Sequence, residues 1–300
     1  MNKIGKMLLP ILLCILVLCS SLSCQLVPFV VVDQGGSTPT PVSTVGTGAL
    51  NKLRVYFIDV GQGDAILIDL ASTEILIDGG DGDTNIVDFL DDYINGSLEV
   101  MIATHPHADH IGGLIDVFDA FIVDNVWTDG ETASSKVYTD FMSKASGSGA
   151  QMHIAHRDDS IVTGNLTLKV MNPPSPLFAD VNENSIVVQL DYGNIDFLFM
   201  GDAGIAAETS MRDAGKLSDI DVLKVGHHGS NSATSIMFLD IVKPEISVYM
   251  AGYGNSYGHP YKVTITNLTN IGSDIYGTDV DGTITITANK YNIINVSTEK

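Results

Sequence analysis

The feature that most constrains this chain is a short run of metal-ligating side chains directly after an apolar segment. Residues 100–103 are apolar and predict a short buried strand. Four potential ligands then fall within six residues: His105, His107, Asp109 and His110. Burying several unpaired polar groups is costly, so this run needs a partner that compensates the cost. Neutral imidazole and carboxylate suit zinc, manganese or iron, and the run therefore predicts a metal-binding loop.

Two further apolar segments also end at potential ligands. Residues 195–200 lead into Asp202, and residues 221–225 lead into His227. In layered α/β folds, side chains that follow the carboxyl ends of neighbouring strands meet at one edge of the sheet. A single turn aspartate or loop histidine is usually structural. The position of both residues after predicted strands nevertheless favours a metal site shared with the first loop.

Short apolar segments alternate with helical patterns along the rest of the chain. We predict strands at residues 53–58, 65–68, 74–77, 164–171 and 185–192, and helices at residues 85–93 and 205–212. A proline-rich segment at residues 172–176 is a candidate connection between two halves. Strands that alternate with helices favour an α/β layered fold.

The N-terminus has the pattern of an export signal. Two lysines precede an apolar run at residues 7–19, and small residues then lead to Cys24. A basic head, an apolar middle and a small-residue exit are typical of a secretory signal, which we place at residues 1–24. The end of this run resembles the lipobox of bacterial lipoproteins, which predicts a lipid anchor on Cys24. Plain secretion and retention of the segment as an anchor are the alternatives.

The segment after the signal differs in composition from the remainder. Residues 25–50 include a long stretch of Gly, Ser, Thr and Pro, which predicts a flexible linker and leaves residues 51–300 as the globular domain. All cysteines precede the linker: Cys14, Cys19 and Cys24. The globular domain therefore has neither a disulfide nor a thiolate metal ligand.

The charge balance limits the classes of partner. The formal net charge is −21, and the 300 residues include 15 Lys and Arg. Such acidity repels polyanions at long range and disfavours a dedicated nucleic-acid binder. Bound metal ions can still supply positive charge locally. The sequence leaves the oligomeric state open.

Seven segments resemble, in order, motifs of the metallo-β-lactamase superfamily. They are residues 57–65 (FIDVGQGDA), 77–80 (IDGG), 104–113 (THPHADHIGG), 182–185 (NENS), 200–202 (MGD), 223–230 (LKVGHHGS) and 255–260 (NSYGHP). Within the superfamily, this combination is most similar to the extracytoplasmic domain of the ComEC/Rec2 competence proteins and to their stand-alone relatives.

The resemblance implies a four-layered αβ/βα sandwich with two divalent metal ions in the cleft between its sheets. Zinc is the expected metal, with manganese as the alternative. By position, the expected ligands are His105 and His107 for the first metal, Asp109, His110 and His227 for the second, and Asp202 as the bridge. Many members supply a third histidine to the first metal, but this chain has residues 182–185 (NENS) there.

Three residues are candidates for catalytic roles. By analogy, Asp109 also orients the metal-bound hydroxide. His259 could donate a hydrogen bond to an anionic transition state or protonate a leaving group, and fixing its loop is the alternative role. His228 flanks the ligand set. A supporting role, in which a carboxylate orients a ligating imidazole, is expected for Asp59, Asp64 and Asp78.

The expected reaction is hydrolysis by a metal-bound hydroxide. The resemblance to competence proteins and to phosphorylcholine esterases favours an extracytoplasmic, membrane-anchored phosphodiesterase or nuclease-like enzyme. Its substrate would be a small-molecule or polymeric phosphodiester, with nucleic acid disfavoured by the acidity. One alternative is a β-lactamase or lactonase, which the NENS segment disfavours. The other is a non-catalytic surface binding protein, which the intact motifs disfavour.

Overall fold

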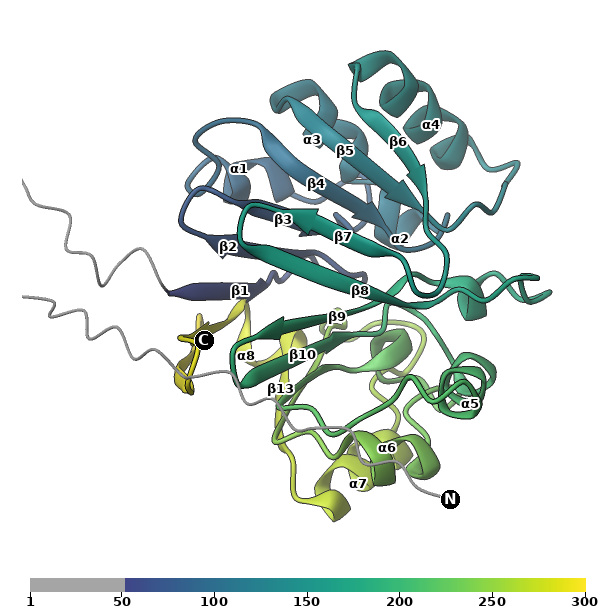
Figure 1. The fold of residues 1–300 in the computed structure, drawn as a ribbon, viewed down its shortest axis with the longest axis vertical. Helices are drawn as coiled ribbons and strands as arrows, with labels where there is room; N and C mark the ends of the chain where they lie inside the picture. The colour runs from purple at the N-terminus through teal and green to yellow at the C-terminus, as the bar shows by residue number, and fades with distance from the viewer. Residues whose placement is uncertain (1–51) are drawn as a thin grey trace, which may run out of the picture. The chain divides into compact units, whose positions relative to one another are not determined.

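The structure, a computed structural model, describes residues 52–300. The predicted signal segment 1–24 and linker 25–50 lie outside the described residues. Residues 52–300 form two β-sheets with helices packed against them (Figure 1). Within this range, no helix has both the length and the apolar character needed to cross a membrane.

The first sheet has eight strands in the order β15-β14-β1-β2-β3-β4-β5-β6. Its strands are β1 (Leu53–Phe57), β2 (Ile66–Leu70), β3 (Glu74–Ile77), β4 (Leu98–Ala103), β5 (Val123–Thr128), β6 (Gln151–Ile154), β14 (Ile284–Ala288) and β15 (Ile293–Thr298). Pairing is antiparallel from β15 to β3 and parallel from β3 to β6. The last two strands of the chain therefore return to the sheet in which the first strands lie.

The second sheet has seven strands in the order β13-β12-β11-β10-β9-β8-β7. Its strands are β7 (Ser160–Thr163), β8 (Leu166–Asn172), β9 (Val187–Tyr192), β10 (Ile195–Phe199), β11 (Val222–Lys224), β12 (Ile246–Tyr249) and β13 (Asp274–Gly277). Pairing is antiparallel from β7 to β10 and parallel from β10 to β13. Each sheet thus has an antiparallel part and a parallel part.

Helices cover one face of each sheet. Those of the first half are α1 (Ile86–Leu90), α2 (Ala108–Ile111), α3 (Leu114–Ala120) and α4 (Lys136–Ser148). Those of the second half are α5 (Ile205–Asp213), α6 (Ile236–Val242), α7 (Lys262–Ile271) and the single turn α8 (Thr278–Asp281). Each set buries its apolar side chains in a separate cluster, with Phe141 in the first and Phe238 in the second.

Strand β2 illustrates why the sheets are covered on both faces. Ile66 and Ile68 pack in the cluster between the two sheets, whereas Leu67 packs under the helices of the first sheet. Successive side chains of a strand point to opposite faces, and burial of each one contributes about 1.5–3 kcal/mol. The continuous apolar run therefore fits a strand with layers on both sides. This arrangement confirms the predicted four-layered αβ/βα sandwich.

The candidate site lies where parallel strands of both sheets end. Asp78 and Thr104 directly follow the parallel pair β3 and β4, while Asp202 and His227 come shortly after the parallel pair β10 and β11. A backbone hydrogen bond from Ile186 N to Thr104 O (2.9 Å) joins the two sheets at this point. The loops that carry the candidate ligands of both halves therefore meet at one edge.

One predicted helix and one predicted strand differ from the structure for reasons that the local hydrogen bonds explain. The helix predicted at residues 85–93 ends at Leu90, because the chain continues as tight turns in which Tyr93 N donates to Leu90 O (3.0 Å). The strand predicted at residues 185–192 begins at Val187, because the preceding residues form the 3-10 helix η1 (Asn182–Asn184). The second difference matters for the site, since η1 borders it.

Candidate metal centre

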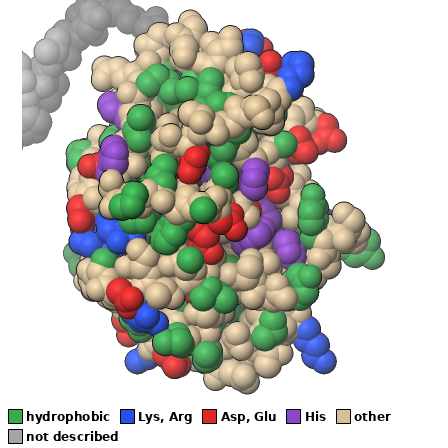
Figure 2. Space-filling model, turned by 90° about the vertical axis from the view of Figure 1, so that its right-hand side faces the viewer, with side chains coloured by type: hydrophobic (Ala, Val, Ile, Leu, Met, Phe, Trp, Pro, Cys, Tyr) green, Lys and Arg blue, Asp and Glu red, His purple; other side chains and the backbone are tan. Residues whose placement is uncertain are grey.

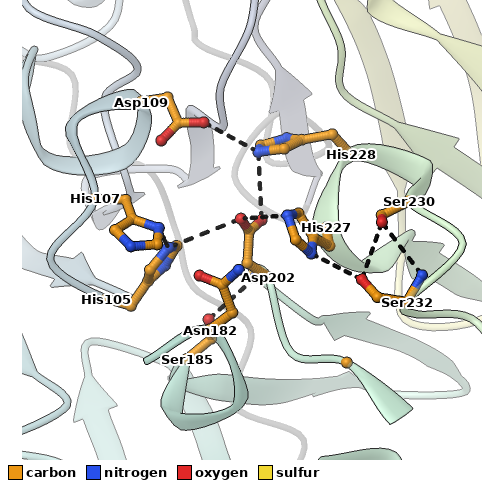
Figure 3. Close-up of polar contacts among 12 residues, drawn as sticks. His105, His107, Asp109, Asn182, Ser185, Asp202, His227, His228, Ser230 and Ser232 are labelled. Atoms are coloured by element: carbon orange, nitrogen blue, oxygen red, sulfur yellow. Dashed lines mark hydrogen bonds and ion pairs between the residues drawn. The ribbon is translucent and has the colours of Figure 1, made fainter. Parts of the chain in front are cut away.

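The loop after β4 brings several predicted ligands into one space. His107 is the N-cap of α2, a one-turn helix that carries Asp109 and His110. Nε2 of His105 lies 3.0 Å from Nδ1 of His107, and the rings of His105 and His110 lie 4.2 Å apart. Figure 3 shows His105, His107 and Asp109 facing the same space. The short helix therefore brings side chains that are close in sequence into one cluster in space.

The imidazole of His110 is held in one orientation by Asp78. Nδ1 of His110 lies 2.8 Å from Oδ2 of Asp78, and a carboxylate only accepts, so Nδ1 carries the proton. Thr104 fixes Asp78 in turn, since its backbone N and its Oγ1 donate to the two carboxylate oxygens at 2.8 and 2.7 Å. The free Nε2 of His110 then points at Oδ1 of Asp202, 3.3 Å away.

The carboxylate of Asp202 is the centre of the cluster. Its backbone N donates to Ser185 Oγ (3.1 Å), which fixes the turn after β10. Four imidazole nitrogens surround its two oxygens: Nε2 of His105 (3.8 Å), His110 (3.3 Å), His227 (3.6 Å) and His228 (3.4 Å). Asp202 is itself buried. One carboxylate thus faces ligands from both halves of the fold (Figure 3).

His228 lies deeper in the cluster than the sequence suggests. Its Nδ1 lies 3.0 Å from the carbonyl oxygen of Met250, so Nδ1 carries a proton and Nε2 is the nitrogen that a metal could bind. That Nε2 lies 3.4 Å from a carboxylate oxygen of both Asp109 and Asp202. Only 1% of the residue is exposed. The ring that the sequence analysis placed beside the ligand set therefore faces its interior.

His227 lies at the edge of the same cluster. Its side chain is 24% exposed, its Nδ1 lies 3.1 Å from Ser232 Oγ, and its Nε2 lies 3.6 Å from Oδ2 of Asp202. Both His227 and His228 have positive φ, 48° and 53°, a region that non-glycine residues rarely adopt. This turn after β11 aims the two adjacent rings at opposite oxygens of Asp202.

Two groups of described residues could each hold a metal ion. One is Asp64, His110, Asp202 and His228, and the other is His105, His107 and Asp202. The buried atoms without a hydrogen-bond partner among the described residues include three that converge here: His110 Nε2, His228 Nε2 and Asp202 Oδ1. Buried polar atoms without partners are costly, and a divalent cation would satisfy all three. The residues therefore fit the expected metal centre.

The carboxylates and imidazoles shift one another's pKa. Burial lowers the pKa of His228, but the carboxylates of Asp202 and Asp64 outweigh it and raise the value to about 9. At neutral pH the metal-free site therefore holds a proton that a cation would displace. Burial raises the pKa of Asp109, but the neighbouring imidazole of His228, 3.4 Å away, and the charge of His110 hold it below its usual value. Asp109 is therefore an anion.

A buried lysine, which the sequence alone does not single out, lies next to the candidate metal centre. Lys224, at the end of β11, is fully buried, donates from Nζ to Gly201 O (3.2 Å) and forms an ion pair with Asp64. Oδ1 of Asp64 lies 3.2 Å from Nδ1 of His228. Lysine is almost never fully buried without a partner. The ion pair with Lys224 therefore holds in place the carboxylate of Asp64 that contacts the His228 ring.

Asp59 lies apart from this network. Its carboxylate accepts a hydrogen bond from Gly61 N (3.2 Å) and pairs with Lys300 (2.9 Å) at the surface. The supporting role expected for three aspartates is thus filled by Asp64 and Asp78.

An open cavity of about 330 Å³ borders the cluster. Its lining is Gln62, His107, Ala108, Asp109, Asn182, Asp202, His227, His228, Tyr257 and His259. Figure 2 shows histidine side chains gathered beside acidic ones on one face of the molecule. None of the lining residues is a lysine or an arginine.

His259 enters this cavity from the loop after β12. Asn255 holds its backbone, accepting from His259 N (3.1 Å) and donating to His259 O (2.6 Å). Burial, together with the charges of His228 and His227, lowers the pKa of His259 to about 4. The imidazole is therefore neutral near pH 7. A neutral imidazole can donate a hydrogen bond but carries no extra proton to transfer.

Comparison with known proteins establishes the family. Residues 58–253 match the sequence profile of the Metallo-beta-lactamase superfamily. The match covers more than half of the chain, which therefore belongs to that superfamily of metal-dependent hydrolases.

Three curated relatives refine this assignment. The chain is 26% identical over 251 residues to ComE operon protein 3 of Bacillus subtilis, a match that covers 77% of this chain and 32% of the relative. It is 27% identical over 239 residues to Competence protein ComA of Neisseria gonorrhoeae (78% and 32%) and 29% identical over 240 residues to Recombination protein 2 of Haemophilus influenzae (78% and 28%). The predicted resemblance to the ComEC/Rec2 competence proteins is confirmed. The chain spans about a third of the length of these relatives.

Solved structures support the fold at low sequence identity. The metallo-beta-lactamase fold protein YhfI from Bacillus subtilis matches with a TM-score of 0.55 at 10% identity, covering 79% of this chain and all of that one. Igni18, a metallo hydrolase from Ignicoccus hospitalis, matches with a TM-score of 0.54 at 17% identity, covering 77% and 98%. At such identities the likeness supports the fold alone.

Proposed function

We propose that this protein is an extracytoplasmic phosphodiesterase that works with two divalent metal ions, zinc or alternatively manganese. The observation that carries the proposal is the carboxylate of Asp202, which both candidate ligand groups share. A carboxylate placed in this way can bridge two cations. Two-metal sites commonly serve the hydrolysis of phosphate esters, because the two ions clamp the attacking and leaving oxygens of a displacement.

The proposed ligand sets follow the directions of the side chains. The first metal is held by His105, His107 and Asp202. The second is held by Asp109, His110, Asp202 and His228. This second set replaces His227, which the sequence analysis assigned to that metal, with His228. The reason is that Nε2 of His228 faces Asp109 and Asp202 from a buried position, whereas His227 stands at the partly exposed edge.

The bound metals would supply a water of lowered pKa as nucleophile. Asp109, which is an anion beside His228, would accept a hydrogen bond from that water and orient it. His259 is neutral near pH 7 and donates a hydrogen bond to an anionic oxygen of the substrate, which is one of the two roles considered for it. His228, Asp64 and Lys224 keep the second site rigid.

The substrate class follows from the charge of the cavity and from the relatives. With no lysine or arginine in the cavity lining, the cations must neutralise the charge of an anionic substrate. A phosphodiester, either a small molecule or a repeating polymer, fits this requirement. The names of the relatives refer to competence and recombination, which favours a DNA-related context, whereas the net charge of −21 opposes tight binding of long nucleic acids.

The location is part of the proposal. Competence-protein relatives are consistent with action at or outside the cell membrane. We propose export through residues 1–24, a lipid anchor on Cys24 with secretion as the alternative, and a linker at residues 25–50 that spaces the catalytic domain (51–300) from the membrane. Radiolabelled palmitate incorporation into the wild type but not into Cys24→Ala would support the anchor.

The test is the hydrolysis of bis(p-nitrophenyl) phosphate by the purified full-length protein, stripped of metal and refilled with zinc or manganese. We expect turnover that requires metal, that is lost in Asp202→Ala and that persists in Asp240→Ala, a control at an exposed position of α6. Nitrocefin serves as the competing substrate. Hydrolysis of nitrocefin alone would replace the proposal with a β-lactamase-type activity, and metal binding without turnover would point to a surface binding protein.

A further inference from the structure

The two proposed metal sites are unequal in their protein ligands. The second can draw on His110, Asp202 and His228 and on Asp109, whose carboxylate lies 3.4 Å from Nε2 of His228, whereas the first has two imidazoles and one carboxylate oxygen. A tetrahedral or octahedral ion with three protein ligands has room for another donor. The 3-10 helix η1 (Asn182–Asn184) lies next to Asp202, since the adjoining Ser185 accepts a hydrogen bond from the backbone N of Asp202.

Two of the side chains in this segment are occupied elsewhere. The carboxylate of Glu183 accepts from Ala207 N (2.7 Å) and Gly204 N (3.1 Å) at the start of α5. The amide of Asn184 is fully engaged, because it donates to Glu131 Oε1 (2.6 Å) and both accepts from and donates to the backbone of Phe178. Asn184 therefore fixes its surroundings and has no free carbonyl oxygen for a metal.

Asn182 is the member of the segment that faces the metal centre. It lines the cavity together with His107 and Asp202, and Figure 3 shows its side-chain amide beside Asp202 and near His105. Within residues 52–300, the buried Oδ1 of Asn182 has no hydrogen-bond partner. A buried carbonyl oxygen without a donor is costly, and a cation beside it would remove that cost.

We propose that Asn182 is a ligand of the first metal and coordinates it through Oδ1. The inference rests on the proposed metal centre and adds a donor to it. A short side chain can serve because the hydrogen bonds of Glu183 and Ser185 anchor the backbone directly after Asn182. The first site then has two nitrogen and two oxygen donors, and the second site keeps its own set.

An amide oxygen in place of an imidazole changes which metal the first site prefers. Carbonyl and carboxylate oxygens suit manganese, whereas imidazole suits zinc. The Asn182→His substitution should therefore shift the first site toward zinc. Asn182→Asp, which has nearly the same shape, keeps an oxygen at the same place and adds a charge, and should bind manganese at least as tightly as the wild type does.

The test measures metal binding and not activity. Metal-free full-length protein is titrated with Mn²⁺ while the electron paramagnetic resonance signal of the free ion is recorded, and zinc affinity is measured by competition with a chromophoric chelator. We expect two Mn²⁺ per chain, with Asn182→Ala weakening one of them by about ten-fold, the size of effect typical for loss of a metal-site partner. The control Asn194→Ala, at an exposed position after β9, should bind as the wild type does.

The outcomes separate this inference from the proposed function. If the wild type binds neither Mn²⁺ nor zinc, the metal centre is wrong and the role of Asn182 falls with it. If the wild type binds two ions and Asn182→Ala binds both with unchanged affinity, only the role of Asn182 is refuted. If Asn182→Ala fails to fold, Asn182→Asp and Asn182→His decide, and an unchanged ratio of manganese to zinc affinity in both would overturn the inference.

Discussion

The ion pair between Lys224 and Asp64 allows a quantitative test of how the site is held together. Both side chains are buried, and Lys224 is fully so. In Lys224→Met the apolar stem is replaced at similar volume, but the carboxylate of Asp64 loses its main counter-charge. Breaking a buried pair by removing one partner typically costs about 3–5 kcal/mol. That is a large part of the roughly 5–15 kcal/mol by which proteins are stable.

The free energy of unfolding is measured by urea denaturation of metal-free protein at pH 7. The fluorescence of Trp127 reports the transition, because this is the only tryptophan in the chain and it stacks on His153 at 4.5 Å between ring centroids. Lys169→Met is the matched control, since Lys169 pairs with Asp191 at the surface. An exposed pair contributes about 0–1 kcal/mol.

A double substitution separates the pair from the packing around it. In Lys224→Met/Asp64→Asn both members of the ion pair are neutral. The loss in unfolding free energy of this double variant should therefore be smaller than the sum of the two single losses, by a coupling energy of about 0.5–3 kcal/mol. If Lys224→Met costs no more than Lys169→Met, or if the two single losses simply add, the ion pair does not support the site in the way described.

Two further predictions concern parts of the fold outside the site. Burial and the charge of Glu99 raise the pKa of Glu74 to about 7, so the folded state binds the proton more tightly than the unfolded state does. The free energy of unfolding should then fall as pH rises from about 4.3 to about 7. In Glu74→Gln the urea midpoint should therefore change less between pH 5 and pH 8 than it does in the wild type. An equal change in both proteins would contradict this role of Glu74. A Cβ on Gly113 would lie 2.1 Å from Gly79 O, whereas a Cβ on Gly147 in α4 would have no atom within 4 Å. Thermal unfolding should therefore show lower stability for Gly113→Ala and higher stability, by up to about 1 kcal/mol, for Gly147→Ala. Equal effects of the two substitutions would refute the steric reasoning.

The fold could be predicted where the apolar pattern was continuous. Strands such as β2 and β10 are buried on both faces, so all but one residue in each is apolar. Helix α4 was not predicted, because its 13 residues bury only Phe141 and Ala145 and include serine and glycine, which weaken the helical pattern. Strand β15 is largely exposed, and its residues gave no alternating pattern to recognise.

The site could be predicted only to the level of the loops that form it. The positions of His105, His110 and Asp202 after predicted strands indicated one shared site. They could not show which of the two adjacent histidines, 227 or 228, lies deeper in that site. The choice between His227 and His228 depends on two consecutive positive φ angles, which no sequence pattern specified. Similarly, the buried position of Lys224 follows from its place at the end of β11 against the other sheet.

The asparagine segment shows the same limit. Residues 182–185 stand where many members of the superfamily supply a third histidine to the first metal. Which side chain faces the metal depends on the hydrogen bonds that Glu183 and Asn184 make with α5 and with residue 178. These partners are distant in the chain, so the orientation of Asn182 became visible only in three dimensions.

The central claim is that Asp202 bridges two metal sites and that His228 belongs to one of them. The direct test is the number of metal ions bound per chain of purified full-length protein. It is measured by inductively coupled plasma mass spectrometry after equilibrium dialysis against zinc or manganese. We predict two ions per chain in the wild type and in His156→Ala, whose side chain is exposed, one in His228→Ala, and none in Asp202→Ala. Full metal content in both Asp202→Ala and His228→Ala, or no metal in the wild type, would contradict the account.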